Sequence, residues 1–236
     1  MFLSRTLKDY ISKVNDFFPI VMITGPRQVG KTSLLEECAK DNRKYVSLDS
    51  SEKRTLAQND PALFLQRYKP PVLIDEIQYA PQLFPYIKEF VDKEKQKGMF
   101  WITGSQQFSL MQNVSETLAG RVGIMHLQGF SQSEKFGNFQ QIPFLPELQN
   151  IENRKSNDIG TDNIFHTIWK GSYPAMWLTS DDNWELFYNS YVQTYIQRDV
   201  RQILNISNEL TFIKFMKAAA AQTGQLLDYA SMARDV

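Results

Sequence analysis

The sequence predicts an α/β protein in which a parallel sheet is flanked by helices and followed by a mostly helical C-terminal region. Short apolar runs alternate with longer segments of helical periodicity, which is typical of repeated βαβ units. The runs expected to form strands cover residues 20–24, 45–49, 72–75, 100–103 and 123–127. Four of these five runs end in a small, hydroxylated or acidic residue. Ligands bind beyond the carboxyl ends of parallel strands, so we expect these polar ends to share one site.

The helical segments and one polar stretch predict how the chain is organised. The segments with helical periodicity cover residues 33–40, 83–97, 184–204 and 210–221. Residues 131–163 are rich in Gln, Asn, Ser and Pro and lack periodicity, which predicts a linker or loop. We therefore expect a core over residues 1–130, a linker over 131–163 and a helical region over 164–236 that is incomplete at its C-terminal end.

The composition excludes several classes of function. Among 236 residues, 26 Lys and Arg balance 26 Asp and Glu, so net charge does not favour binding to DNA. The single cysteine, Cys38, excludes an internal disulfide and a cysteine zinc site, and we expect it to pack within a helix. No apolar run approaches the roughly 18 residues that a membrane-spanning helix needs, so we expect no membrane partner. Charge also interrupts the N-terminus too early for a secretion signal, which predicts a cytoplasmic protein.

The first expected strand leads into a phosphate-binding motif. The pattern G-x-x-x-x-G-K-[ST] is matched by Gly25, Pro26, Arg27, Gln28, Val29, Gly30, Lys31 and Thr32, and Ser33 follows it in the same segment. Glycines let backbone N–H groups approach phosphate oxygens, and Lys31 brings positive charge to the β- and γ-phosphates. The Thr32 hydroxyl is expected to bind Mg²⁺, so ATP and Mg²⁺ are the predicted ligands. The preceding strand and following helix argue against an ordinary glycine-containing turn.

Two adjacent acids end the third apolar run, at Asp75 and Glu76. An acid near a magnesium nucleotide holds the metal, usually through water, and a second acid orients the attacking water. We expect Asp75 in the first role and Glu76 in the second, since adjacent residues at a strand end diverge. A solvated acidic turn is the alternative. With the phosphate loop upstream, the pair predicts hydrolysis of ATP rather than transfer to a second substrate.

Further polar candidates lie after the fourth run and before the fifth. Thr103, Ser105 or Gln106 could sense the γ-phosphate, and the sequence does not choose among them, although Ser105 is taken as a catalytic candidate. Arg121 lies just before the fifth run and is expected near the same crevice. There it could stabilise charge in the transition state, while a surface salt bridge is the alternative.

Several segments together resemble a family of prokaryotic AAA-type ATPases that carry a C-terminal domain of unknown function 4143. These segments include GPRQVGKTSLL at 25–35, VLIDEIQYAP at 72–81, TGSQQFSLM at 103–111, ETLAGRV at 116–122, GSYPA at 171–175 and YVQTYIQRDVRQIL at 191–204. The resemblance implies that the strand ending at Thr103 lies between the phosphate-loop strand and the Asp75 strand. It also implies that Glu76 is the catalytic base and that Arg121 serves the nucleotide site, within one chain or from a neighbouring subunit. The closing segment would open a winged-helix-like unit.

These observations predict an ATPase that turns over slowly without a partner and couples the cycle to movement of its helical C-terminal region. The absence of an N-K-x-D motif from the sequence argues against GTP. One alternative is a nucleotide-gated interaction module with little turnover. Another is a DNA-associated ATPase, with DNA bound by C-terminal sequence beyond this chain. The two possible positions of Arg121 leave open whether the active form is a homo-oligomer.

Overall fold

The computed structural model describes residues 3–105, 114, 116–137, 146–152, 159–195 and 209–236. The chain divides into two compact units, Met1–Asp181 and Asp182–Val236. Each unit is described by itself below.

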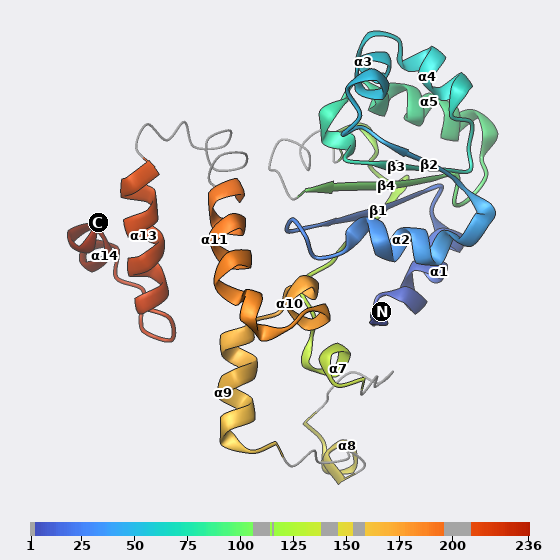
Figure 1. The fold of residues 1–236 in the computed structure, drawn as a ribbon. Coiled ribbons are helices and arrows are strands. Elements are labelled where there is room, and N and C mark those ends of the chain that lie inside the picture. Colours follow the sequence, from blue (N-terminus) through green and yellow to red (C-terminus); the bar gives the residue numbers. More distant parts are fainter. Residues whose placement is uncertain (1–2, 106–113, 115, 138–145, 153–158, 196–208) are drawn as a thin grey trace. The chain divides into compact units, whose positions relative to one another are not determined.

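The first unit contains a five-stranded parallel sheet with the strand order β2-β3-β4-β1-β5 (Figure 1). Its strands are β1 (Ile20–Gly25), β2 (Lys44–Ser47), β3 (Val72–Asp75), β4 (Phe100–Ser105) and β5 (Val122–His126). The predicted parallel sheet is therefore confirmed, with strand boundaries that differ by no more than a few residues. The order also confirms that the strand containing Thr103 lies between the phosphate-loop strand and the Asp75 strand.

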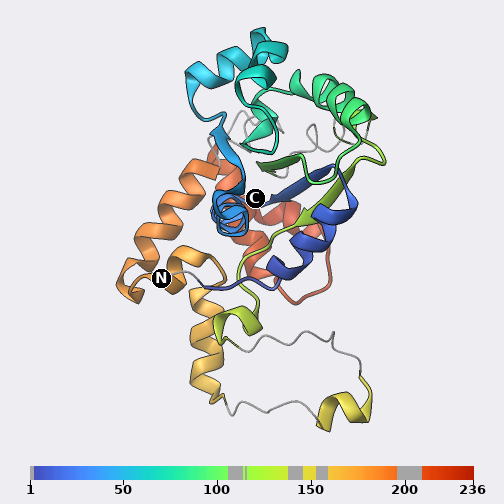
Figure 2. The ribbon, with the colours of Figure 1, turned by 90° about the vertical axis from the view of Figure 1, so that its right-hand side faces the viewer.

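Helices cover both faces of this sheet (Figures 1 and 2). Over the described residues, this unit includes the helices α1 (Lys8–Phe17), α2 (Lys31–Ala39), α3 (Ser51–Asn59), α4 (Pro61–Arg67), α5 (Leu83–Glu94), α7 (Gln132–Lys135), α8 (Leu148–Glu152), α9 (Thr161–Lys170) and α10 (Pro174–Leu178). Short 3-10 turns are η1 (Lys40–Asn42), η2 (Ile77–Tyr79) and, at the junction of the units, η3 (Asp181–Asn183). One core cluster joins the sheet to α3, α4 and α5, and a second joins it to α1 and α2.

The strand β1 shows why the sequence reads as an uninterrupted apolar run. Ile20 and Met22 belong to the cluster under α3–α5, whereas Val21 and Ile23 belong to the cluster under α1 and α2. A strand buried on both faces has no polar side to alternate with. Cys38 packs against the second cluster, and burial raises the pKa of its thiol, which agrees with the expected packing role.

The first unit extends beyond the boundary that the sequence predicts after residue 130. The amide of Phe130 donates to the carbonyl of Ser172 at 2.7 Å. Met176 in α10 is fully buried, and Tyr173 packs against the cluster under α1 and α2. Residues expected to begin a separate helical region therefore pack on the sheet domain. The predicted linker also contains α7, which begins with a capping box formed by Ser131 and Glu134, and α8; residues 138–145 and 153–158 lie outside the described residues.

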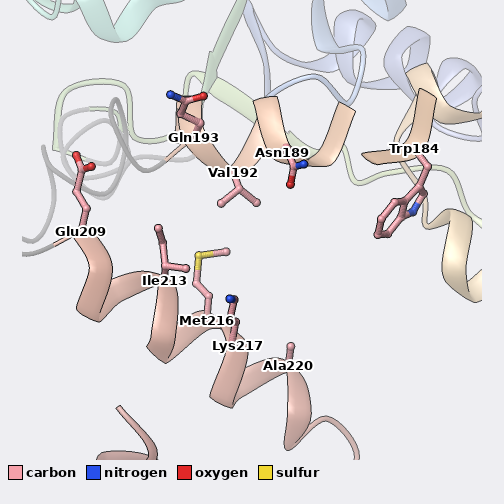
Figure 3. A pocket seen from close by; sticks show the side chains of 9 residues that line it. All are labelled: Trp184, Asn189, Val192, Gln193, Glu209, Ile213, Met216, Lys217 and Ala220. Atoms are coloured by element: carbon pink, nitrogen blue, oxygen red, sulfur yellow. The ribbon is translucent and has the colours of Figure 1, made fainter. Parts of the chain in front are cut away.

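The second unit contains α11 (Trp184–Tyr195), α13 (Glu209–Ala221) and α14 (Tyr229–Asp235). The end of the predicted helix over 184–204 falls in residues 196–208, outside the described part. A hollow of about 870 Å³ lies between α11 and α13, where the side chains of Val192, Ile213 and Met216 point toward one another (Figure 3). Across the described ranges, no helix is both long and apolar enough to cross a membrane.

Candidate functional site

The loop between β1 and α2 contains two glycines, Gly25 and Gly30, and the structure favours glycine at each for a different reason. At Gly25, φ is +148° and a Cβ atom would lie 2.0 Å from the backbone oxygen of Leu127, so both conformation and close approach require glycine. At Gly30, φ is +88° but a Cβ would meet no described atom within 4 Å, so conformation alone favours glycine. Gln28 adopts a positive φ of 60° as well. Strained backbone of this kind concentrates at ligand-binding loops.

Lys31 begins α2 and turns its ammonium group back into the loop. Its side chain is buried, and Nζ donates to the carbonyls of Gly25 at 3.1 Å and Pro26 at 2.8 Å. The first N–H groups of α2 have no partner within the helix, and the helix dipole places positive potential there. A fixed cation and a helix N-terminus at one loop form a favourable environment for phosphate oxygens. Three other residues of the predicted phosphate-binding segment differ in exposure: Val29 is buried, Arg27 is partly buried, and Ser33 is exposed in the first turn of α2.

Asp75 lies at the carboxyl end of β3 and is held by three hydroxyl groups. Thr32 Oγ1 donates to Asp75 Oδ1 at 2.7 Å, and the Thr103 hydroxyl donates to the same oxygen. Tyr45 Oη donates to Asp75 Oδ2 at 3.1 Å. Burial, followed by the charge of Asp75, raises the pKa of Tyr45 to about 12, so the phenol remains a donor at neutral pH. Both carboxylate oxygens therefore have fixed positions beside the phosphate loop.

Glu76 turns away from Asp75 because its backbone leaves the strand in a left-handed conformation, with φ of 57°. Its amide donates to Thr103 Oγ1 at 3.1 Å, so Thr103 joins the Asp75 carboxylate to the backbone of Glu76. The carboxylate of Glu76 accepts a hydrogen bond from the side-chain amide of Gln78, in the turn η2. The two acids thus diverge, as expected for adjacent residues at a strand end.

Ser105 ends β4 directly opposite Gly25 in the strand register. Its side chain is 4% exposed, and within the described part of the chain its hydroxyl has no hydrogen-bond partner. Buried hydroxyls are normally satisfied, so one that lacks a protein partner beside a phosphate loop is suited to a ligand oxygen. The hydroxyl of Thr103, the second candidate, already bonds to the Asp75 carboxylate and to the backbone amide of Glu76, and Gln106 lies outside the described residues.

Arg121 does not lie near this crevice, so that prediction is wrong for a single chain. Its backbone carbonyl accepts from the amide of Ile20, where β1 begins, at 3.2 Å. Its guanidinium donates to both carboxylate oxygens of Asp92 in α5, at 2.6 and 2.9 Å. Parallel strands place their amino ends at the edge of the sheet opposite their carboxyl ends. Because Arg121 precedes its strand, the same rule applied to the sequence would have excluded it.

Sequence reasoning missed three residues that support the site. Tyr45 and Gln78 bind the two acids, and Arg5 donates through Nη1 to the carbonyl of Val29 in the phosphate loop at 2.9 Å. The position of Gln78 two residues after Glu76 is a signal that could have identified it. Tyr45 and Arg5 reach the site only through tertiary contacts, for which the motif spacing gives no signal.

A hollow of about 290 Å³ adjoins the loop on the side of β5 and the N-terminal segment. It is lined by Arg5, Thr6, Leu7, Tyr10, His126, Leu127, Gln128, Gly129, Ser131 and Glu134. Leu127 connects it to the phosphate loop, because its amide donates to the carbonyl of Thr24 at 2.8 Å and its own carbonyl lies against Gly25.

The oxygen donors fit a magnesium ion that is shared with phosphate. Thr32 and Asp75 supply a hydroxyl and a carboxylate, and Mg²⁺ usually takes one or two protein ligands together with phosphate oxygens and water. In the described ranges, no group of three or more His, Cys, Asp or Glu side chains could hold a metal by itself. The site therefore has the donors for a nucleotide-bound cation rather than a metal cage made of protein side chains.

A phosphate loop between β1 and α2, with β4 inserted between β1 and the acidic strand β3, defines a nucleotide-binding P-loop protein of the AAA type. Residues 17–136 match the AAA domain family over more than half of the chain, and the chain belongs to that family. Residues 161–236 match the domain of unknown function 8612. The expected domain of unknown function 4143 is therefore not the one that matches the C-terminal region.

The chain is similar to longer proteins and, more distantly, to solved structures. It is 26% identical over 219 residues to "Uncharacterized protein Mb2031c" of Mycobacterium bovis and to "Uncharacterized protein Rv2008c" of Mycobacterium tuberculosis, covering 92% of this chain and 44% of each relative. The chain thus spans less than half the length of these relatives. AMPPCP-bound DnaA from Aquifex aeolicus is 10% identical with a TM-score of 0.44, covering 93% of this chain and 69% of DnaA. A single-residue variant of RuvB from Thermotoga maritima is 21% identical with a TM-score of 0.39, covering 56% of this chain and 47% of RuvB.

Proposed function

We propose that this chain binds ATP with Mg²⁺ and hydrolyses it to ADP and phosphate. The observation that carries the proposal is the hydrogen bond of 2.7 Å between Thr32 and Asp75, with Glu76 directly following. A passive phosphate-binding loop needs no acidic pair beside it, whereas hydrolysis needs a metal-holding acid and a base for water. The loop from Gly25 to Ser33 would bind the phosphates, with the ammonium of Lys31 directed at the β- and γ-phosphates.

Thr32 and Asp75 are the residues proposed to hold the magnesium ion, Thr32 directly and Asp75 through water. The ion would neutralise charge on the phosphate oxygens and so favour attack at the γ-phosphorus. Tyr45 and Thr103 keep the Asp75 carboxylate in place, which reduces the reorganisation needed when the nucleotide binds.

Glu76 is the proposed general base. It would accept a proton from water as the water oxygen forms a bond to the γ-phosphorus, while the bond from phosphorus to the β–γ bridging oxygen breaks and ADP leaves with that electron pair. The side-chain amide of Gln78 holds the Glu76 carboxylate in position. The hydroxyl of Ser105, which has no partner among the described residues, is suited to donate to an oxygen of the γ-phosphate.

Slow turnover is expected because Arg121 does not supply positive charge at this site within one chain. An arginine placed on the transferring phosphoryl group accelerates related reactions by about 10³–10⁵. Arg121 instead pairs with Asp92 at the opposite edge of the sheet.

Coupling to the C-terminal region is proposed to pass through the segment after β5. The backbone bond between Phe130 and Ser172 joins this segment to the turn before α10. Gly129 packs so closely on Ser172 that a Cβ would lie 2.3 Å from the serine Oγ. A shift of residues beside the phosphate loop would therefore reach residues 171–175 through tight contacts, since packed segments transmit small displacements.

The nucleoside is proposed to bind in the hollow of about 290 Å³ beside the loop. Tyr10 in α1 and His126 at the end of β5 are aromatic residues that line it, and Tyr10 is 55% exposed. The hollow adjoins the phosphate loop through Leu127, so one ligand could occupy both.

Two variants test the proposed hydrolysis. Glu76→Gln should retain ATP binding and lose at least about 100-fold in phosphate release, since a positioned base contributes about 10²–10⁴. Lys31→Ala should lose ATP binding measured by calorimetry, while Lys44→Ala, at the exposed amino end of β2, should bind normally. The proposal would be abandoned if Glu76→Gln released phosphate at the unmodified rate and Lys31→Ala still bound ATP.

A further inference from the structure

Arg5 is a buried arginine that joins the phosphate loop to two other segments. It is 6% exposed and donates through Nη1 to the carbonyl of Val29 at 2.9 Å. Nη2 donates to the carbonyl of Gln128 at 2.5 Å, and Nε pairs with Glu134 Oε1 at 3.2 Å. The guanidinium also lies 4.7 Å from the centre of the Phe130 ring. All three nitrogens of the guanidinium are thus committed to protein atoms.

The ion pair with Glu134 does not by itself explain this arrangement. Burial lowers the pKa of Arg5, and the charge of Glu134 opposes that shift. Burial alone would raise the pKa of Glu134, but hydrogen bonds from Thr6 and from the amide of Ser131, with the charge of Arg5, lower it overall. Both groups are therefore charged at neutral pH. A buried ion pair contributes little net stability compared with apolar packing. Net stability therefore does not account for the hydrogen bonds that the Arg5 guanidinium makes to backbone carbonyls.

We propose that Arg5 is a positioning residue that orients the amide of Gly30 toward the nucleotide phosphates. This inference depends on the proposed ATP binding. A trans peptide is planar, and its carbonyl and N–H point in opposite directions. Because the Val29 carbonyl is fixed on Arg5, the N–H of Gly30 in the same peptide points to the other side of the loop.

The position most in need of such a constraint is Gly30 itself. Its φ is +88°, and no described atom would contact a Cβ within 4 Å, so no side chain restricts this residue. Its carbonyl accepts from the amide of Leu34 at 3.0 Å, which leaves the peptide on its amino side to be fixed by Arg5. Glycine rotates more freely than any other residue, and an unconstrained peptide would have to be ordered when phosphate binds. The bond from Arg5 provides that order in advance, which strengthens binding through preorganisation.

Arg43 offers a matched control at the other edge of the sheet. It is a partly buried arginine, and burial lowers its pKa to about 10. It donates to the carbonyl of Gly98 at 2.5 Å and to Asn15 Oδ1 at 2.8 Å, and it lies 4.0 Å from the centre of the Trp101 ring. Arg43 directly precedes β2, so it lies beside the amino ends of the strands, away from the phosphate loop.

The experiment compares Arg5→Lys with Arg43→Lys in the full chain. Lysine keeps the charge but lacks the planar fork that reaches several acceptors together. Both variants should lower the thermal midpoint measured without nucleotide. Only Arg5→Lys should weaken ATP binding with Mg²⁺, by about tenfold in Kd, which corresponds to one lost hydrogen bond of about 1.4 kcal/mol. Competition by magnesium pyrophosphate should weaken by the same factor, which would exclude the nucleoside hollow as the cause because pyrophosphate has no base.

Three results would overturn the inference: unchanged ATP affinity in Arg5→Lys, an equal loss in Arg43→Lys, or a loss confined to ATP with pyrophosphate unaffected. If the unmodified chain bound no ATP, the proposed function itself would fail. If only the inference about Arg5 failed, the unmodified chain would still bind ATP, so the two failures are distinguishable. Should Arg5→Lys not fold, the double variant Arg5→Gln with Glu134→Gln removes both buried charges together. The same tenfold loss is expected from it, and normal affinity would again contradict the inference.

Discussion

Thr32 Oγ1 donates to Asp75 Oδ1 at 2.7 Å, and this bond joins the first turn of α2 to the last residue of β3. The strand order explains where it forms. Because β4 lies between β1 and β3, the bond connects the helix that follows β1 to an acid that is two strands away in the sheet. Thr103, on that intervening strand, donates to the same carboxylate oxygen. The Thr32 hydroxyl and the Asp75 carboxylate therefore meet beside the phosphate loop.

Asp75→Asn should reduce phosphate release at saturating ATP and Mg²⁺ by about 100-fold, because a neutral amide no longer balances the metal charge. Binding of ATP without Mg²⁺ should change little, since Lys31 and the loop remain. Phosphate release measured across a magnesium titration checks this, with Asp92→Asn as the control carboxylate at the opposite edge of the sheet. Equal losses in both variants would contradict the assignment.

Ser105→Ala should separate activity from stability. Its hydroxyl is buried without a hydrogen-bond partner among the described residues, so its removal should leave the thermal midpoint unchanged or higher. Turnover should fall by about tenfold if the hydroxyl donates to the γ-phosphate, which corresponds to about 1.4 kcal/mol. ADP, which has no γ-phosphate, should bind with unchanged affinity in calorimetry. A weakened affinity for ADP would contradict the role.

Arg121→Ala should leave turnover per chain unchanged in dilute protein, because the guanidinium pairs with Asp92 away from the loop. Phosphate release measured over a range of protein concentrations checks this. A loss that appears only at high concentration would support a contribution from a neighbouring subunit. A loss at every concentration would contradict the placement of Arg121 in the structure.

Tyr10→Ala should weaken ATP binding by about tenfold if the base stacks in the hollow, since an aromatic contact contributes about 1–3 kcal/mol. Binding of magnesium pyrophosphate should be unchanged, whereas a damaged phosphate loop would weaken the binding of both ATP and pyrophosphate. Tyr86→Ala, on the exposed surface of α5, is the control. Unchanged ATP affinity in Tyr10→Ala would exclude the hollow as the nucleoside site.

The features of the fold and site that depend on short, contiguous stretches of sequence are predictable. The buried strands read as apolar runs because both faces are covered, and the loop and acidic pair lie at their carboxyl ends, where ligands bind. The hydrogen bond between Thr32 and Asp75 follows from those two motifs once the strand order is known.

Features that depend on tertiary contact were not predictable from spacing. Arg5 and Tyr45 belong to no local pattern and become supporting residues only when the chain folds around the loop. The change in composition predicts that the core ends after residue 130. Tyr173 and Met176 follow the polar stretch in the sequence but pack on the sheet domain. A polar stretch shows that those residues are exposed to solvent. The segment that follows it can still pack on the same core.

The pair formed by Arg5 and Glu134 makes stability depend on pH. Because the pKa of Glu134 is lowered in the folded protein, its carboxylate contributes stability above its unfolded pKa of about 4.3. That contribution is lost as pH falls through the lower, folded value. Glu134→Gln leaves Arg5 without its buried anion, so it should destabilise the protein by about 3 kcal/mol at pH 7.

Urea unfolding of Glu134→Gln at a series of pH values should show the difference from the unmodified chain shrinking below about pH 4. Glu37→Gln, which removes the exposed pair with Lys8, should show little effect at any pH. A difference for Glu134→Gln that stayed constant down to acidic pH would mean that the side chain acts through packing and not through its charge.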